Sequence, residues 1–380
     1  MDNAISLQVA EVEPAETAGS DSDGDLWPSA WADDSHLYSA CGDGAGFGPG
    51  GWSDVVVNRI SGTPKAGLTG QRLAAGDQIC PIWGDPARYN RKPTGMIAVP
   101  ACGLGHDRLV LAVQELGFGE GDHAFNHSPT ASLATSDDYG QSWECEEPAF
   151  TGGIFTTIMF LDFGQSQSQA ESFARICPQA NGEFGYAFGL DHCWRSSYTQ
   201  FVQDPDKLHL ARFPLHHATE LRAWEFFAGG SDAERPQWSK SIRDRKPVLV
   251  DKRRIFVGDM AKGGYASPIS QGGVVWIEPL RCLVYSSWTE FTFEFYCSPT
   301  PWGPWALFGS FHFGEYPWRG PGSAKPWHGG YATSLPSKFL DADGLGGYLQ
   351  SNWFVRSGES EGNSYRFSLR HIRFSERKHE

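Results

Sequence analysis

Residues 24–44 read GDLWPSAWADDSHLYSACGDG, which is the pattern of a β-hairpin. An aromatic-rich run over 26–32 is followed by the turn-forming cluster at 33–35 and by a second extended run that ends in Gly-Asp-Gly. With the turn centred on Asp34, residues whose numbers add up to 68 face each other, so Asp25 pairs with Asp43. The Cβ atoms of directly opposed residues in antiparallel strands lie about 4.5–5.5 Å apart.

Two carboxylates held this close repel each other, and one of them is expected to hold its proton more tightly than the other. This is the electrostatic arrangement that an acid/base pair needs. The alternative is that Asp25 and Asp43 are ordinary turn or edge residues in contact with solvent.

The composition favours many short strands joined by tight turns. The 380 residues include 45 Gly, 24 Pro and 15 Trp, and no long stretch has apolar residues at helical spacing. The formal net charge of -14 argues against binding to nucleic acid or to an anionic membrane. No apolar run is long enough to span a bilayer. We expect an all-β protein with no nucleic-acid or membrane partner.

The eight cysteines are scattered, without a Cys-x-x-Cys pair, so they permit disulfides without requiring them. Cys41, Cys282 and Cys297 lie in strand-like runs, where buried free thiols are expected. The first residues have no basic region followed by an apolar core, and hence no secretory signal. This predicts a cytoplasmic protein, or a chain supplied without its leader.

A loose repeat runs through the chain. Strands that end at or near an acidic or amide residue recur at 37–43, 109–115, 184–191, 282–290 and 347–354. Each has a partner strand after it, at 54–62, 131–143, 208–215, 293–305 and 365–374, and an extended run before it. Repeats of about 75 residues suit four-stranded sheets. We therefore predict a β-propeller of five four-stranded blades, with six or seven blades as the alternative.

The ends of the chain are expected to meet in this fold. Residues 5–12 have the alternation of a strand, which could complete the last blade and close the ring. Residues 13–24 are small, polar and acidic. The predicted organisation is an N-terminal strand and flexible connector over 1–24 and a single propeller domain over 25–380.

The sequence SDDYGQSW at 136–143 is a good match to the Asp-box, the hairpin turn of sialidase-like propellers. In such a turn the aspartate accepts backbone N–H bonds, the glycine adopts dihedrals that other residues avoid, and the tryptophan packs beneath. We assign Asp138 and Trp143 to structure.

Strand ends of one polarity converge at one mouth of a propeller, and this rule selects the candidate site. The aspartates Asp25 and Asp43 are the catalytic candidates. The candidates for substrate binding are Asp191, Glu115, Glu290, Arg91, Lys92, Arg195, Tyr265, His328, Trp27, Trp31 and Trp327. The acids and bases would hold hydroxyls or tune the catalytic pair, and the three tryptophans would stack on sugar rings.

Other site chemistries are not indicated. Four converging carboxylates could bind a divalent cation, but no calcium-type Asp-x-Asp-x-Asp loop is present. The histidines lack metal-ligand spacing, and there is no phosphate loop, dinucleotide fingerprint or Gly-x-Ser-x-Gly elbow. We predict neither a metal nor a cofactor.

Three stretches of the sequence carry a resemblance to a known family: DLW at 25–27 followed by YSACGDGAGF at 38–47, SPTPWGPW at 298–305 and SLPSK at 334–338. In these stretches the chain resembles the five-bladed propeller glycoside hydrolases that include endo-D-arabinanases. In that family one aspartate opens the first inner strand and a second closes the next strand in a Gly-Asp turn. The resemblance implies that Asp25 and Asp43 are the catalytic pair and that hydrolysis inverts the anomeric centre.

Three functions are compatible with these observations. The first is a glycoside hydrolase in which one aspartate protonates the leaving oxygen and the other activates water. The second is a polysaccharide lyase, with His328 or Tyr265 as base and Arg91, Lys92 or Arg195 neutralising a uronate. The third is a non-catalytic propeller that binds glycan or protein. The expected partner of the first two is an oligo- or polysaccharide.

Overall fold

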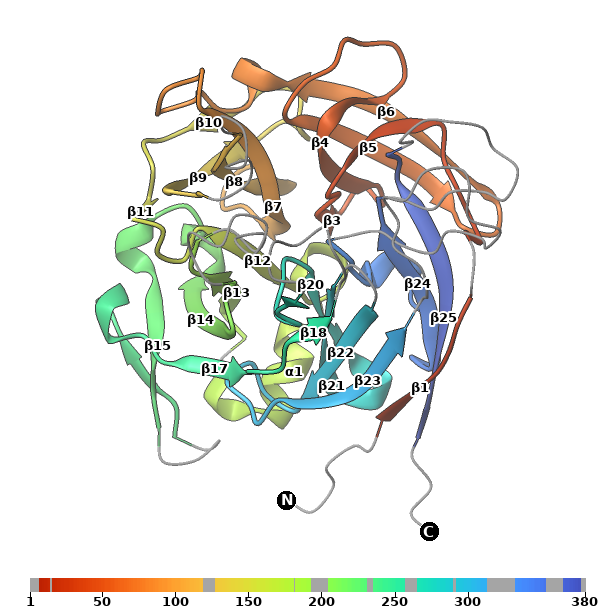
Figure 1. Cartoon of the computed structure of the whole chain (residues 1–380), viewed down its shortest axis with the longest axis vertical. Helices are drawn as coiled ribbons and strands as arrows, with labels where there is room; N and C mark the ends of the chain where they lie inside the picture. The colour runs from red at the N-terminus through yellow and green to blue at the C-terminus, as the bar shows by residue number, and fades with distance from the viewer. Residues whose placement is uncertain are drawn as a thin grey trace.

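The computed structural model describes residues 7–13, 16–118, 127–180, 182–192, 204–230, 235–256, 265–289, 292–312, 332–352 and 365–376. Figure 1 shows the sheets following one another around a central axis in the order of the sequence. The short helix α1 spans Ala170–Ile176. Single 3-10 turns occupy Gly76–Gln78, Gln165–Gln167, Pro178–Ala180, Leu215–His217, Leu221–Ala223, Ile242–Asp244, Glu278–Leu280 and Ser337–Phe339.

The first sheet contains the hairpin that the sequence predicts. Its strands are β2 (Ser22–Asp25), β3 (Ser29–Trp31), β4 (Leu37–Phe47), β5 (Val56–Thr63) and β6 (Gly67–Ala75). The pairs Ser29–Ser39, Ala30–Tyr38 and Trp31–Leu37 follow the expected register. Nearer the open end a bulge shifts the pairing by one residue, so that Asp25 lies opposite Gly42 and not opposite Asp43.

The second and third sheets are also antiparallel, with outer strands of only a few residues. The second comprises β7 (Tyr89–Pro100), β8 (Asp107–Gly117), β9 (Thr130–Ser136), β10 (Glu144–Cys145) and β11 (Phe150–Thr151). The third comprises β12 (Thr157–Asp162), β13 (Phe184–Leu190), β14 (Lys207–Pro214), β15 (Glu225–Gly229), β16 (Gln237–Ser239) and β17 (Pro247–Val250).

The fourth sheet comprises β20 (Gly273–Ile277), β21 (Cys282–Trp288), β22 (Thr292–Ser298) and β23 (Ala306–His312). A short parallel contact between β12 and β20 joins it to the third sheet. A separate two-stranded ladder pairs β18 (Ile255–Phe256) with β19 (Tyr265–Ala266). The last sheet combines β24 (Gly346–Ser351), β25 (Ser368–Glu376) and β1 (Leu7–Val12).

Pairing of β1 with β25 joins the two ends of the chain, as the sequence predicts. Neighbouring sheets pack through their apolar faces: Val57 of the first sheet shares a buried cluster with Leu109 of the second, and Val110 of the second shares another with Ala187 of the third. Sheets arranged around an axis and packed face to face form a β-propeller. The all-β propeller prediction is therefore confirmed, while the count of five blades and the domain boundary at residue 25 stay predictions.

Cysteine chemistry follows the expected pattern in part. A disulfide joins Cys80 and Cys145, a pairing that the sequence did not specify. Cys41 and Cys282 are buried free thiols, and Cys297 is half-buried. Among the described residues, no helix is both long enough and apolar enough to cross a membrane.

Candidate functional site

Asp25, Asp43 and Lys92 meet at one end of the sheets, and we call these three residues the Lys92 cluster. The Lys92 Nζ atom lies 2.5 Å from Oδ2 of Asp43 and 3.8 Å from Oδ1 of Asp25. Asp25 and Lys92 are buried, whereas Asp43 is partly exposed. The two aspartates thus contact one ammonium group although their backbones are not directly opposed.

The electrostatics of the Lys92 cluster differ from those expected for an isolated acid pair. Burial alone lowers the pKa of Lys92, but the charges of Asp25 and Asp43 outweigh it and raise the pKa above its ordinary value. The lysine is therefore charged at neutral pH. A buried cation thus contacts both carboxylates, which the sequence pattern did not predict.

The backbone around the Lys92 cluster is strained. Leu26 and Trp27 follow Asp25 with φ values of 75° and 55°, and Asp43 itself has a φ of 46°. Non-glycine residues in this region cost on the order of 1–3 kcal/mol each and persist where the surroundings enforce them, often at functional sites. A Cβ atom on Gly42 would lie 2.6 Å from Oδ1 of Asp25, so glycine is needed there for the aspartate to approach Lys92.

The prediction that Trp27 stacks on sugar is wrong. Its side chain is fully buried, its indole N–H donates to the Gly24 carbonyl at 2.7 Å, and its ring packs edge-on against Phe47 and Phe367. The positive φ at residues 26 and 27 turns the chain so that the ring enters the core. Trp31 is half-buried against the same apolar cluster and pairs with Leu37 beside the hairpin turn, at the opposite end from Asp25.

Arg91 and Glu115 do not join the Lys92 cluster. Because side chains alternate between the faces of a strand, Arg91 and its neighbour Lys92 point in opposite directions. The Arg91 guanidinium contacts Asp54 at 2.9 Å and Asp77 at 2.5 Å. Glu115 is buried and accepts hydrogen bonds from the backbone N–H groups of residues 83 and 84 and from the Thr130 hydroxyl. Both side chains fix loops.

Asp191 forms a second charged group, at the end of β13. Its carboxylate accepts the backbone N–H of Phe155 at 2.9 Å and contacts Arg245 at 2.5 Å and His209 Nε2 at 3.8 Å. Burial lowers the pKa of His209 to about 4, although Asp191 partly opposes the shift. His209 is therefore neutral at pH 7.

Buried polar side chains lie next to both groups, and sequence reasoning missed them. Gln114 lies opposite Lys92 on β8, and its Oε1 accepts the hydroxyl of Thr157 at 2.9 Å. The Thr157 hydroxyl also lies 3.2 Å from the carbonyl of His192, next to Asp191. The available signal was the presence of polar residues inside strands that are otherwise apolar.

The other predicted residues lie outside the part of the chain that the structure describes. These are Arg195, Glu290, Trp327 and His328, together with the side chain of Tyr265.

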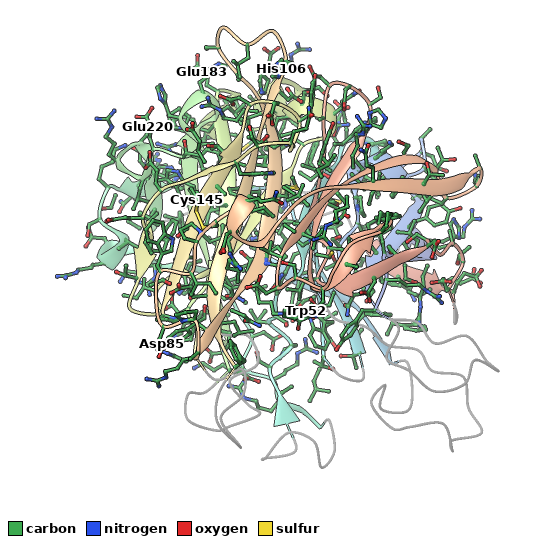
Figure 2. The ribbon with its side chains drawn as sticks, turned by 90° about the horizontal axis from the view of Figure 1, so that it is seen from above. Trp52, Asp85, His106, Cys145, Glu183 and Glu220 are labelled. Atoms are coloured by element: carbon green, nitrogen blue, oxygen red, sulfur yellow. A yellow bond between two sulfur atoms is a disulfide. The ribbon has the colours of Figure 1, made fainter. Side chains whose placement is uncertain are left out.

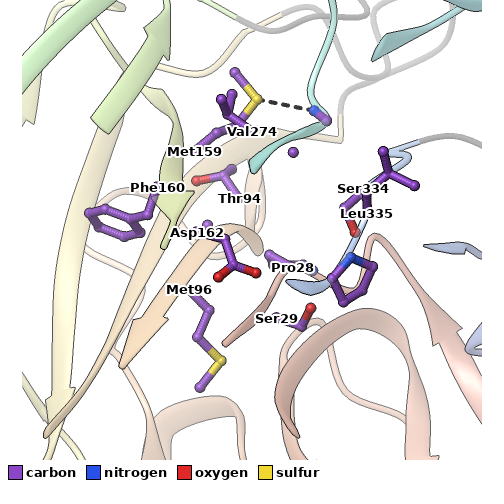
Figure 3. Close-up of a pocket in the computed structure, with 14 residues that line it drawn as sticks. Pro28, Ser29, Thr94, Met96, Met159, Phe160, Asp162, Val274, Ser334 and Leu335 are labelled. Atoms are coloured by element: carbon purple, nitrogen blue, oxygen red, sulfur yellow. Dashed lines mark hydrogen bonds between the residues drawn. The ribbon is translucent and has the colours of Figure 1, made fainter. Parts of the chain in front are cut away.

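A pocket lies between segments of neighbouring sheets (Figure 3). Residues from several sheets line it, among them Pro28, Thr94, Met159, Val274 and Leu335. Asp162 points into this pocket, and its carboxylate accepts the backbone N–H groups of residues 164 and 337. Burial raises the pKa of Asp162 above its ordinary value.

The comparisons with known proteins give a likeness of fold. No protein-family model matches the chain, and no curated protein matches it. A solved structure from Bacteroides ovatus ATCC 8483, which carries only a provisional assignment as a hydrolase, is 8% identical, with 94% of this chain and 86% of that chain covered and a TM-score of 0.50. At this identity the match describes the fold alone.

Two further structures are similar at lower scores. One is the α-L-arabinofuranosidase of Podospora anserina, in complex with cellotriose, at 9% identity, 95% coverage of both chains and a TM-score of 0.45. The other is a GH43_1 enzyme from Xanthomonas citri, at 14% identity, with 96% of this chain and 90% of that chain covered and a TM-score of 0.45.

Proposed function

We propose that this propeller is a glycoside hydrolase that acts on an oligo- or polysaccharide, with Asp25 and Asp43 as its catalytic pair. The observation that carries the proposal is the convergence of both aspartates on the buried Lys92 ammonium, amid strained backbone. Such strain and buried charge are costly, and they are typical of sites retained for function.

The pair supplies the two proton transfers that hydrolysis needs. One carboxyl group donates a proton to the leaving oxygen as its bond to the anomeric carbon breaks. The other carboxylate takes a proton from the water whose oxygen bonds to that carbon. Because Asp43 is the more exposed of the two, it is the group that first meets the substrate. D-arabinan is the first substrate to test, on the resemblance of the motifs at 25–27 and 38–47.

The lyase alternative is less well supported by the described residues. A lyase needs a cation to neutralise a uronate, but Lys92 and Arg91 already contact carboxylates of the protein. In a non-catalytic glycan-binding propeller, the Lys92 cluster would serve only to stabilise the fold. The strained backbone at Asp43 costs stability and therefore argues against a purely structural role.

The test is a screen of wild type and Asp43→Asn against D-arabinan, L-arabinan, rhamnogalacturonan and other plant and bacterial glycans, with product masses measured by mass spectrometry. We expect products that are heavier by one water per cleavage and a loss of rate of about 10²–10⁴-fold in the variant.

The thermal unfolding midpoint of Asp43→Asn serves as the control and should stay near that of wild type. Products without the added water would establish the lyase. Equal rates for wild type, Asp25→Asn and Asp43→Asn would exclude the proposed catalytic pair.

A further inference from the structure

Two exposed tryptophans lie on loops at the end of the molecule that carries the Lys92 cluster, and we propose that Trp52 and Trp83 are the platforms on which sugar rings of the substrate stack. The inference rests on the proposed function and assigns to these residues the role that the sequence pattern gave to Trp27 and Trp31. The inference implies a substrate of several sugar units, because two separate indole rings need two sugar units to stack on them.

Trp52 is placed beside the catalytic candidate by backbone pairing. It is 66% exposed, in the loop between β4 and β5. The next residue, Ser53, exchanges two backbone hydrogen bonds, of 2.8 and 3.1 Å, with Gly44, which directly follows Asp43. On the other side of Trp52, the Gly51 carbonyl accepts a hydrogen bond from Arg72 at 2.7 Å. The indole is thus exposed on a backbone that is fixed on both sides.

Trp83 is exposed on a second fixed loop. It is 38% exposed, and its backbone N–H donates to Oε1 of Glu115 at 2.5 Å. The Gly84 N–H donates to the same oxygen at 2.7 Å. A buried carboxylate is costly unless it is hydrogen-bonded, and here those bonds fix a surface loop. Glu115 is accordingly a positioning residue for Trp83 and not a group that contacts substrate.

Both loops lie at the same end of the molecule. Figure 2 shows Trp52 and Asp85 on one side and His106 on the other. Arg91 bridges the two segments, because its guanidinium donates to Asp54, two residues after Trp52, and to the Cys80 carbonyl, three residues before Trp83. Of the tryptophans among the described residues, only Trp52 and Trp83 are exposed.

The chemistry of the indole ring identifies the ligand class. An indole is a large apolar surface with a polar edge, and leaving it in water forgoes the stabilisation of burial. Indole rings on fixed backbone at the same end of the molecule as a carboxylate pair suit a partner with flat apolar C–H faces and polar edges. A sugar chain has both features.

The experiment labels the protein with 5-fluorotryptophan and follows its ¹⁹F NMR spectrum while the D-arabinan fragments and the other glycans of the screen are added to Asp43→Asn. Trp52→Phe and Trp83→Phe assign the two resonances. We expect the resonances of Trp52 and Trp83 to shift and those of Trp27 and Trp31 to stay unchanged.

Kinetics provide a second test. In the active protein, Trp52→Ala and Trp83→Ala should each raise KM about tenfold with little change in kcat. The control variant Ile176→Ala, at an exposed position on α1, should change neither constant.

Glu115→Gln tests the positioning role. It should move the Trp83 resonance and raise KM, but should add nothing in a Trp83→Ala background, because the two changes act through one residue. An equal effect of Glu115→Gln in both backgrounds would contradict this role.

The outcomes separate the inference from the proposed function. Hydrolysis with unchanged KM in both tryptophan variants would overturn the inference and leave the hydrolase in place. Shifts of both resonances without hydrolysis would overturn the hydrolase and retain a glycan-binding site. Neither hydrolysis nor a shift with any glycan would overturn both.

Discussion

The aspartates at opposite ends of the sheets have different partners: hydrogen-bond donors surround Asp138, whereas a buried ammonium group contacts Asp25 and Asp43. The Asp138 turn, residues 136–143, lies at the end of β9, beside the start of β8. Oδ1 of Asp138 accepts the N–H groups of Gln141 and Ser142 at 3.0 and 2.9 Å, and both serine hydroxyls of the turn also donate to this carboxylate. Burial raises the pKa of Asp138, but the hydrogen bonds outweigh it and lower the pKa overall.

In the Lys92 cluster, Asp43 is satisfied less completely than Asp138. Two carboxylates contact one ammonium group there. The buried Oδ1 of Asp43 accepts no hydrogen bond within the part of the chain that the structure describes. Buried polar atoms of native proteins are nearly always paired, and the exceptions call for an explanation. The difference teaches that the Asp138 carboxylate is fully used in holding its turn, whereas Asp43 has an acceptor atom left, which the proposed function assigns to a ligand.

Replacing Lys92 is expected to have the largest effect on stability of the changes considered for the two sites. Lys92→Met leaves two carboxylates without their buried cation, and we expect a loss of about 3–5 kcal/mol in the free energy of unfolding at pH 7. Chemical denaturation measures this loss, with Lys65→Met, at an exposed position, as the control. The double variant Lys92→Met/Asp43→Asn should lose less than the two single changes combined, because the charge of Asp43 no longer needs the ammonium.

The pH dependence of the Lys92 contribution has a definite sign. The folded-state pKa of Lys92 is raised above its ordinary 10.5, so its contribution is fully present below that pH and is lost as the pH rises through the folded value. The difference in stability between wild type and Lys92→Met should therefore be constant around neutrality and shrink in strong alkali. A loss below 1 kcal/mol at pH 7 would show that the ammonium is not needed for folding.

The Asp191 group provides a titration in the acid range. His209 has its pKa lowered from 6.5 to about 4 and is almost fully buried, with Asp191, Arg245, Lys207 and the Lys246 backbone as its electrostatic neighbours. The unfolded chain therefore binds the proton more readily. The contribution of His209 to the free energy of unfolding is fully present above pH 6.5. It falls by about 2–4 kcal/mol as the pH decreases towards 4.

Denaturation of wild type and His209→Gln between pH 4 and 7 tests this titration. The variant should be less dependent on pH in that range even if its stability at pH 7 is lower. Parallel curves for the two proteins would contradict a buried neutral histidine.

The sequence predicted the fold well because strand periodicity and turn residues are local signals. The hairpin register at residues 29–31 and 37–39 follows from a turn centred on Asp34. The pairing of Asp25 failed by one residue because a bulge lies between residues 23 and 25, and the positive φ values that turn Trp27 inwards have no local signal in a leucine and a tryptophan.

The site could be predicted only in part, because it depends on contacts between sheets. Asp25, Asp43 and Lys92 were all selected from strand ends, but the ion pairs between them require β2, β4 and β7 to be side by side. The roles of Arg91 and Glu115 were wrong for the same reason, since their partners lie in loops distant in sequence. The exposure of Trp52 and Trp83 depends on which loops are held at the surface.

The smallest expected effect is that of replacing Asp138, and it concerns stability alone. Asp138→Ala removes the acceptor of four hydrogen bonds and should lower the free energy of unfolding by about 1–3 kcal/mol. Hydrolysis should continue at the wild-type kcat, since the Asp138 turn lies at the opposite end of β8 and β9 from the strand ends that carry Glu115 and Lys92. Asp43→Asn should show the reverse, with activity lost and stability kept. A fall in kcat for Asp138→Ala at a temperature where it stays folded would mean that the two ends of the sheets are coupled and that the separation of stability from function is wrong.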